Sequence, residues 1–277
     1  MTIKVSHESP IALLPESVEY NDYQYCLVHL MEEQEEYKEW FLEKYRAKVP
    51  NGEILLDNSI FELKAAFDSE KYAVWCERIK PNYYIVPDVL ENAYATMNKF
   101  RVFVEDYGDL PGAKIGAVQG NTWTDVVECY RYMRDNADYI ALSFDFSMYQ
   151  ITGQSGPNDK NFKLKRQASG RQNLVKRLIE EGEWAWNKPH HLLGASLASE
   201  FEWYVDNNIY NVKSLDTSNP VVAGLLGYTY NGDLGLDHKP SQLLAELISA
   251  QPDEDAVERI LYNTSQFKRI IKRKYWA

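Results

Sequence analysis

The chain has 277 residues, of which 45% are hydrophobic and 26% charged, and this length fits one large domain with a sizeable core. No apolar run approaches the ~20 residues that span a bilayer and no apolar signal-peptide core follows Met1, so we expect a cytoplasmic protein without a membrane partner. The three cysteines and five histidines show neither disulfide nor zinc-ligand spacing, so we expect no metal and no cofactor.

The formal net charge of −11 is unevenly distributed. Residues 158–178 hold seven basic side chains and one acidic one, and residues 268–274 hold five more basic ones, which leaves the rest near −22. Because the local field decides contact with a polyanion, the first segment predicts a nucleic-acid surface; the alternative is a solvated helix face. Its candidate binding residues are Lys160, Lys163, Lys165, Arg166 and Arg171.

Short apolar runs alternate with amphipathic segments along nearly the whole chain. Runs typical of buried strands cover 25–30, 54–57, 83–86, 114–118, 139–144, 191–195 and 212–215. Segments typical of helices cover 33–48, 58–79 with a break near 68–69, 91–107, 122–136, 162–182, 241–250 and 253–274. The irregular stretch 146–160 contains two glycines and a proline, which predicts a lid or binding loop.

This alternation predicts an α/β fold. Seven β/α repeats are clear, and 220–235 is either an eighth strand or a short helix and a strand. No GxGxxG follows the first strand, which disfavours an open dinucleotide-binding sheet. We therefore predict a TIM-type (β/α)8 barrel, one domain over 1–277, with a basic insertion after the fifth of these strands.

Polar residues stand where these strands end, and in a barrel such residues converge on one mouth. They are Asp57, Asn58, Ser59, Asp88, Gln119, Gly120, Ser143, Gly194, Ala195, Ser196 and Asp216. Three acids and an amide suit a reaction in which one carboxylate attacks carbon, another moves a proton and a third holds hydrogen-bond donors. The alternative is that the three aspartates cap helices and Phe61 belongs to the core.

Four motifs in the same order resemble those of the tRNA-guanine transglycosylase superfamily, over about 54–220. The family's Asp-Ser-Gly-Gly-Phe/Tyr-Gln looks like Asp57-Asn58-Ser59-Ile60-Phe61-Glu62, and its Val-Gln-Gly-Gly looks like Val118-Gln119-Gly120-Asn121. Its Tyr/His-Leu-Met/Leu-Gly-Val-Gly looks like His191-Leu192-Leu193-Gly194-Ala195-Ser196, and its Phe-Asp-x-x-x-Pro looks like Leu215-Asp216-Thr217-Ser218-Asn219-Pro220.

The departures from that family bear on the substrate. The CxCxxC zinc site, the Arg-bearing run after the nucleophile and the glycine pair after the first aspartate are all missing. These features help the tRNA enzymes dock their substrate, so the chain is more similar to the compact, zinc-free 7-deazaguanine DNA transglycosylases of bacteria and their viruses. That resemblance implies guanine sites in DNA and a free, preQ0-like 7-deazaguanine base as partners, in a bacterial or phage-infected cytoplasm.

The resemblance also implies a role for each motif residue. Asp216 would attack C1′ of the sugar and Asp57 would relay protons to and from the bases. Asp88 would recognise the guanine-like ring, and Gln119 would bind its carbonyl edge. Phe61 would stack on the ring, and Leu193 would form the bottom of the pocket. Asn58, Gly120, Ser143 and Gly194 complete the expected base-binding set.

Three other functions remain open at this point. They are an RNA-directed transglycosylase, a retaining (β/α)8 glycosidase that uses Asp57 and Asp216, and a non-catalytic nucleic-acid-binding subunit. Oligomeric state, including a homodimer or a partner protein, also stays open.

Overall fold

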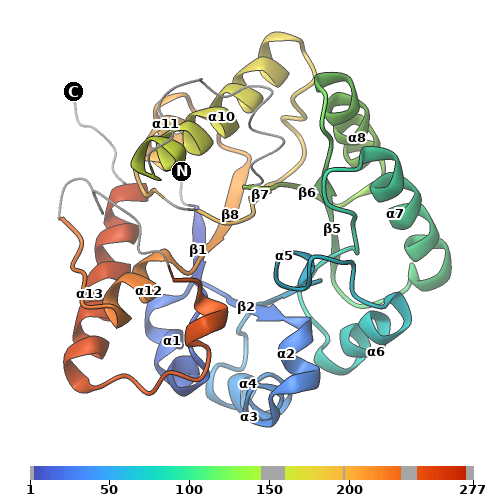
Figure 1. Ribbon diagram of the computed structural model, residues 1–277. Helices are drawn as coiled ribbons and strands as arrows, with labels where there is room; N and C mark the ends of the chain where they lie inside the picture. Colours follow the sequence, from blue (N-terminus) through green and yellow to red (C-terminus); the bar gives the residue numbers. More distant parts are fainter. Residues whose placement is uncertain (1–2, 145–159, 196, 232–241, 273–277) are drawn as a thin grey trace. The chain divides into compact units, whose positions relative to one another are not determined.

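The computed structural model describes residues 3–144, 160–195, 197–231 and 242–272, without the side chains of 160–164. Eight parallel strands form one sheet in the order β1-β8-β7-β6-β5-β4-β3-β2, with helices between consecutive strands (Figure 1). This is the α/β class with TIM-type (β/α)8 topology, and the fold prediction is confirmed. No helix of the described ranges is long and apolar enough to cross a membrane.

The strands are short and the helices vary in length. The strands are β1 (Lys4–His7), β2 (Gln24–Leu27), β3 (Ile54–Asp57), β4 (Tyr83–Ile85), β5 (Ala113–Val118), β6 (Tyr139–Leu142), β7 (His190–Leu192) and β8 (Val212–Thr217). The α-helices are α1 (Leu14–Tyr20), α2 (Val28–Glu33), α3 (Glu35–Glu39), α4 (Tyr45–Lys48), α5 (Ile60–Leu63), α6 (Ser69–Ile79), α7 (Ala93–Tyr107), α8 (Trp123–Asn136), α10 (Lys160–Glu180), α11 (Glu200–Asp206), α12 (Asn219–Leu225) and α13 (Glu254–Ile271). Irregular helical turns occupy Ile11–Leu13, Trp40–Lys44 and Leu244–Leu247.

The eighth strand of the sheet is β1 at the start of the chain, so the interpretation of 220–235 as the eighth strand is wrong, whereas the alternative of a short helix there is confirmed; 232–235 lie outside the described residues. Residues 219–225 form α12 instead, where Pro220 occupies the first turn, in which its missing N–H costs no hydrogen bond. β1 pairs in parallel with β8, from Lys4 opposite Ser214 to His7 opposite Thr217. The predicted helix over 241–250 is only a 3-10 turn, and most of the loop expected at 146–160 lies outside the described residues.

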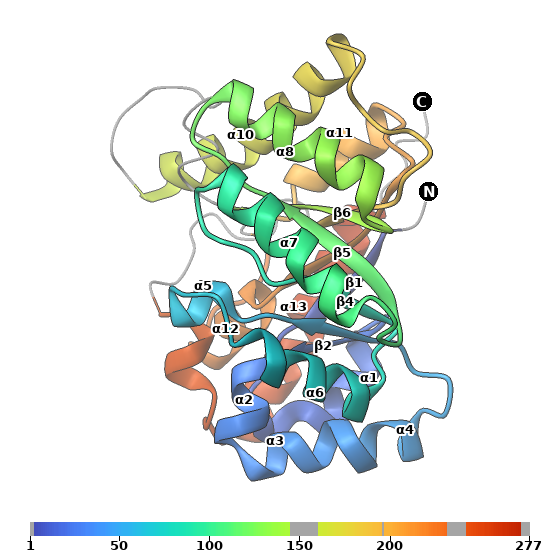
Figure 2. The same cartoon turned by 90° about the vertical axis from the view of Figure 1, so that its right-hand side faces the viewer.

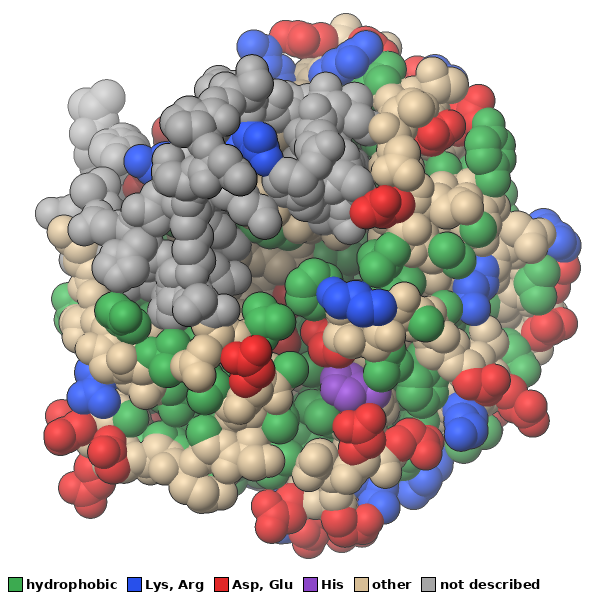
Figure 3. Space-filling model, viewed as in Figure 1, with side chains coloured by type: hydrophobic (Ala, Val, Ile, Leu, Met, Phe, Trp, Pro, Cys, Tyr) green, Lys and Arg blue, Asp and Glu red, His purple; other side chains and the backbone are tan. Residues whose placement is uncertain are grey.

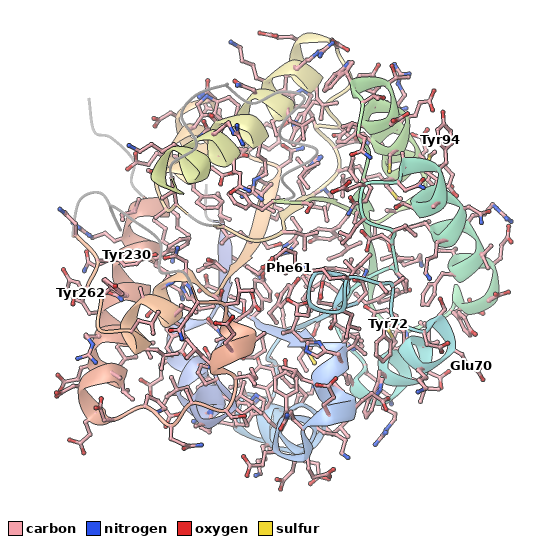
Figure 4. The ribbon with its side chains drawn as sticks, in the orientation of Figure 1. Phe61, Glu70, Tyr72, Tyr94, Tyr230 and Tyr262 are labelled. Atoms are coloured by element: carbon pink, nitrogen blue, oxygen red, sulfur yellow. The ribbon has the colours of Figure 1, made fainter. Side chains whose placement is uncertain are left out.

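The chain divides into two compact units. One unit comprises residues 23–143 and 185–189 and contains β2 to β6. Its strands pair in parallel, and α7 and α8 run side by side along β5 (Figure 2). Tyr72 of α6 donates its hydroxyl to the carbonyl of Leu56 at 2.9 Å, which fixes that helix to β3 (Figure 4). The expectation of one domain stays a prediction.

The other unit comprises residues 1–22, 144–184 and 190–277 and contains β1, β7 and β8. Here α12 packs on α13 so closely that a Cβ at Gly224 would lie 2.6 Å from Ile260 Cγ1. Buried Asn263 of α13 accepts from the Tyr230 N–H at 2.8 Å and donates to the Pro220 carbonyl at 3.2 Å. Figure 4 shows Tyr230 beside these helices. α13 therefore fixes the segment that follows β8.

His7, the last residue of β1, is buried against the rings of Tyr20 and Phe267. Burial, and secondly the charge of Lys268, lower the pKa of the imidazole from 6.5 to about 3. The folded protein therefore holds this histidine neutral, while an unfolded chain binds a proton near pH 6.5. Stability contributed by neutral His7 is present above pH 6.5 and is lost as the pH falls towards 3.

We expect the free energy of unfolding to fall by about 2 kcal/mol more between pH 7 and pH 5 in the parent than in His7→Leu, because leucine binds no proton. Urea unfolding of both proteins at the two pH values measures this difference. Equal losses in the two proteins would show that His7 does not titrate in this range.

Candidate active site

In the unit that contains β2 to β6, four polar side chains lie at or just after the carboxyl ends of neighbouring strands. We call them the acid–amide cluster, and they are Asp57, Asn58, Asp88 and Gln119. All four are buried. The structure thus brings together a set that the sequence placed only at separate strand ends.

Asp88 is the centre of this cluster. Its Oδ1 accepts from Asn58 Nδ2 at 2.8 Å, and its Oδ2 accepts from Gln119 Nε2, also at 2.8 Å. Burial raises the pKa of the Asp88 carboxyl, and the two amide donors oppose that shift. A buried carboxylate is thereby held by neutral donors, with lone pairs left for a ligand.

The two amides are themselves oriented by the backbone. Asn58 Oδ1 accepts from the Ile60 N–H at 3.0 Å, and Gln119 Oε1 accepts from the Glu91 N–H at 3.0 Å. These bonds settle which end of each amide faces Asp88. After Gln119 the chain turns at Gly120, where φ is +156° and a Cβ would meet the backbone nitrogen of Val126 at 2.9 Å. The second Nε2 hydrogen of Gln119 is suited to donate to a carbonyl oxygen.

Asp57 ends β3 and accepts two hydrogen bonds. Tyr25 donates its hydroxyl to Oδ1 at 2.9 Å, and the backbone N–H of Ser59 donates to Oδ2 at 2.6 Å. Ser59 has φ of +58°, the left-handed conformation that favours glycine. The turn after β3 therefore holds a serine in a backbone conformation that glycine adopts more readily.

Two further residues of the expected base-binding set, Phe61 and Ser143, differ from the cluster in burial. Phe61 on α5 is 58% exposed, so the alternative of a core phenylalanine is wrong (Figure 4). The ammonium group of Lys64 lies 3.9 Å from the centre of its ring. Ser143 follows β6 and is partly exposed.

In the unit that contains β7 and β8, a second set of polar groups surrounds Asp216. We call it the Asp216 cluster, and it comprises Asp216, His191, Ser214 and Gly194. His191 Nε2 lies 3.0 Å from Asp216 Oδ1, and His191 Nδ1 lies 2.8 Å from Ser214 Oγ. The Gly194 N–H donates to Oδ1 at 3.2 Å and to Oδ2 at 3.1 Å.

The hydrogen-bond chemistry constrains the proton on Nε2. An ionised carboxylate only accepts, so a bond from His191 Nε2 to ionised Asp216 requires the hydrogen on Nε2. With that hydrogen in place, Nδ1 accepts from the Ser214 hydroxyl if the ring is neutral and donates to it if the ring is an imidazolium. Within the described contacts, Oδ1 has two donors, whereas Oδ2 has only the shared Gly194 N–H. Oδ2 is thus the oxygen better suited to attack an electrophile.

Neither Asp88 nor Asp216 caps a helix. The helix after β4 is capped by Asn92, whose side chain accepts from the Ala95 N–H. The helix after β8 begins at Ser218 without a side-chain cap. The capping alternative is therefore wrong for both carboxylates, and Asp57 bonds a turn N–H before the short α5 rather than its first-turn amides.

The basic helix α10 differs from expectation at one position. Arg171 is fully buried and ion-paired with Glu200, so its assignment to nucleic-acid binding is wrong. Lys165 is exposed and Arg166 is partly exposed, as a phosphate-binding role requires. The side chains of Lys160 and Lys163 lie outside the described residues.

Sequence reasoning missed three functional groups: the Tyr25 hydroxyl, the His191 ring and the Arg171–Glu200 pair. Strand alternation puts Tyr25 on the same face as Leu55 and Asp57, which could have indicated the first. Likewise, the pairing of His191 with Ser214 places both on the Asp216 face of β8. For Arg171 the signal was its place on the buried stripe of α10, with Ala168 and Leu174.

The residues that the structure describes include no group of three or more His, Cys, Asp or Glu side chains placed to hold a metal ion. The chemistry open to these clusters is that of carboxylates, amides and an imidazole. Such groups perform nucleophilic attack, proton transfer and recognition of N–H donors.

Removing the Gln119 donor should test the electrostatics of Asp88. Gln119→Leu should lower the free energy of unfolding by ~1–3 kcal/mol at pH 7, because a buried carboxylate loses a hydrogen bond. The pKa of the Asp88 carboxyl is already raised in the folded protein. Protonated Asp88 therefore contributes stability to the fold at low pH, and this contribution is lost as the pH rises. The variant should therefore be less destabilised at pH 4 than at pH 7.

Asp88→Asn provides the control, since asparagine does not ionise. In that background the cost of Gln119→Leu should be the same at both pH values, measured by urea unfolding. A cost that is independent of pH in the parent as well would show that Gln119 does not stabilise the Asp88 anion.

No protein-family model matches the chain, and no curated protein matches it. Its function is therefore inferred from the chemistry of the two clusters.

Proposed function

We propose that the protein is a base-exchange transglycosylase that replaces guanine in DNA with a 7-deazaguanine derivative, through a covalent aspartyl–glycosyl intermediate on Asp216. The observation that supports this most is the buried Asp216 carboxylate, oriented by His191 and Gly194 with Oδ2 less occupied than Oδ1. A carboxylate held in this way can attack a sugar carbon without first losing a proton.

In the first displacement, Asp216 Oδ2 bonds to C1′ of the nucleotide while the bond from C1′ to N9 of guanine breaks. The electron pair goes to N9, and the leaving base takes a proton. In the second, N9 of the incoming 7-deazaguanine loses its proton and attacks C1′, which releases the carboxylate. Two displacements at one carbon retain its configuration, as in retaining glycosidases.

The donors on Asp216 serve the second displacement as much as the first. A glycosyl ester is useful as an intermediate only when the carboxylate is also a competent leaving group. The His191 and Gly194 bonds are 3.0–3.2 Å long, and they stabilise the anion when it is released. The Gly194 N–H is a neutral donor, so it moderates the nucleophile without pairing it to a full positive charge.

Asp88 and Gln119 are suited to recognise the base. A guanine-like ring presents N1–H and an exocyclic amine, both donors, next to a carbonyl acceptor. Asp88 accepts from such donors in charge-assisted bonds, and the second N–H of Gln119 matches the carbonyl. Adenine, which lacks the N1–H, would leave the buried carboxylate without that partner. Phe61 and Leu193 would contact the ring faces.

Asp57 is suited to carry the proton that each displacement moves. Its contact with the Tyr25 hydroxyl provides a second exchangeable proton within 2.9 Å. Transfer by such a group accelerates a reaction by ~10²–10⁴. The nucleic acid itself would be bound by Lys165 and Arg166 on α10, and a base within a duplex must first be extruded from the stack.

The test is base exchange with defined substrates. The protein is incubated with duplex DNA, single-stranded DNA or tRNA, together with labelled guanine or preQ0, and the nucleosides are analysed by mass spectrometry. The proposal expects the label in DNA. Label only in RNA would favour the RNA-directed enzyme. Hydrolysis of an activated glycoside without base exchange would favour a glycosidase. Binding of nucleic acid without either reaction would favour a non-catalytic subunit.

The two aspartates should differ when each is changed to asparagine. Asp216→Asn removes the anionic oxygen, so both exchange and any nucleic-acid adduct that survives denaturing electrophoresis should be lost. Asp57→Asn keeps the nucleophile and loses proton transfer, so exchange should slow by ~10²–10⁴ while an adduct still forms. Circular dichroism and melting check that both variants fold.

An adduct that persists in Asp216→Asn and disappears in Asp57→Asn would reverse the two roles. Normal exchange by both variants would remove these carboxylates from the reaction altogether.

The basic residues of α10 should be visible in the salt dependence of DNA binding. Changing Lys165 and Arg166 to glutamine should lower the slope of log K against log[salt] by up to about 2, since each phosphate contact contributes ~0.9. Lys176→Gln is the matched control, because it is exposed on the same helix and lies 3.8 Å from Glu180. An unchanged slope in the double variant would place the phosphates elsewhere.

A further inference from the structure

Arg171 and Glu200 form a fully buried ion pair between α10 and α11. Arg171 Nε donates to Glu200 Oε1 at 2.6 Å, and Nη2 donates to Oε2 at 2.9 Å. Both side chains are 0% exposed. Taking two charges out of water is costly, and such a pair is often no more stabilising than apolar side chains of the same volume. Its presence therefore calls for an explanation other than stability.

The rest of the guanidinium group is bonded to the turn after β7. Nη1 donates to the Leu193 carbonyl at 3.0 Å, and Nη2 donates to the Gly194 carbonyl at 3.0 Å. The Phe144 ring lies 5.1 Å from the guanidinium carbon. One planar side chain thus holds two successive carbonyls while its charge is balanced by Glu200.

The Leu193 carbonyl and the Gly194 N–H belong to one peptide group. Because that group is planar and trans, its C=O and N–H point in opposite directions. Arg171 bonds the carbonyl on one side, and Asp216 accepts the N–H on the other. Fixing the carbonyl therefore fixes the direction of the N–H, in a turn where Gly194 has φ of +66°.

We propose that the Arg171–Glu200 pair positions Asp216, by aiming the Gly194 N–H at its carboxylate. Arg171 acts through this peptide group and is a positioning residue. Its importance for a reaction rests on the proposed function, but its effect on the Gly194 N–H does not. Lysine cannot take the same role, because one ammonium group lacks the planar set of donors that reaches Glu200 and both carbonyls together.

The Gly194 amide can be observed without any activity. Leucine precedes glycine at only three places in the sequence, which are Gly194, Gly227 and Gly235. Labelling with carbonyl-¹³C leucine and ¹⁵N glycine therefore gives three amide signals. Leu226→Ile and Leu234→Ile each remove one signal and leave that of Gly194 assigned.

The main variant is Arg171→Met combined with Glu200→Leu, which removes the pair without leaving a buried charge. The Gly194 signal should shift, and its hydrogen exchange should become at least about tenfold faster, while the melting temperature falls less than in Arg171→Met alone, because only the two carbonyls lose their donors and no charge is left buried. Arg171→Met with the glutamate retained should melt at a lower temperature. The matched control is Arg177→Met with Glu181→Leu, an exposed ion pair on the same helix, which should leave the Gly194 signal unchanged.

Arg171→Lys is the second variant, and it keeps a positive charge beside Glu200. It should fold and still release the Gly194 N–H, so the test remains decisive if the double variant does not fold. A folded variant in which the Gly194 signal and its exchange match the parent overturns the proposal.

Kinetics separate this proposal from the proposed function. If the parent exchanges bases, Arg171→Lys should lower kcat at least about tenfold and leave KM for the free base unchanged, because Asp88 and Gln119 are untouched. If the parent shows no exchange and the Gly194 amide still responds, the positioning role stands and the proposed function fails. If the Gly194 amide signal is unchanged in the variants and base exchange is normal, the positioning role is wrong and the proposed function is unaffected.

Discussion

A carboxylate that is taken out of water must find donors, and the identity of those donors divides the buried acids of this protein into two kinds. Glu200 receives a guanidinium group that covers both of its oxygens. Asp88 receives two side-chain amides, and Asp216 an imidazole and one backbone N–H. Side-chain and backbone amide donors lower the cost of burial without saturating the charge. Glu200 is thereby fixed as a structural partner, whereas the other two retain the capacity to bind or attack.

Asp57 at the end of β3 and Asp216 near the end of β8 each accept a backbone N–H from a residue in the left-handed conformation, from two residues along the chain in the first case and from the turn after β7 in the second. Ser59 and Gly194 both have left-handed backbones, with φ of +58° and +66°, and each directs its N–H to a carboxylate. For Gly194 that conformation is without steric cost, while for Ser59 it costs on the order of 1 kcal/mol. A strained residue kept beside a buried acid is typical of sites where geometry serves function.

The sequence could predict this architecture because strand ends are a local property. Alternating apolar runs located seven of the eight strands, and the residues after them held Asp57, Asp88, Gln119 and Asp216 in the expected places. The sequence pattern did not predict β1, because two of its four residues, Ser6 and His7, are polar although they are buried. Parallel pairing with β8, and not composition, makes that segment a strand.

The contacts inside the clusters could not be predicted, because they join residues that are far apart in the chain. Asn58 and Asp88 are 30 positions apart, and His191 and Asp216 are 25 apart. Periodicity shows which face a side chain occupies but not which partner it meets there.

The basic side chains of α10 show that the role of a charged residue depends on its ion-pair partner. In the sequence its basic side chains look alike, yet Arg171 is paired with Glu200, and Arg177 with Glu181 one turn further along. Lys176 likewise faces Glu180. The second half of the helix is therefore largely neutralised, and the phosphate-binding hypothesis rests on Lys165 and Arg166. The face in Figure 3 likewise carries acidic and basic side chains interspersed. In an acidic protein, a polyanion would have to be bound by a few cations placed apart from the carboxylates, because a cation paired with Asp216 would weaken it as a nucleophile.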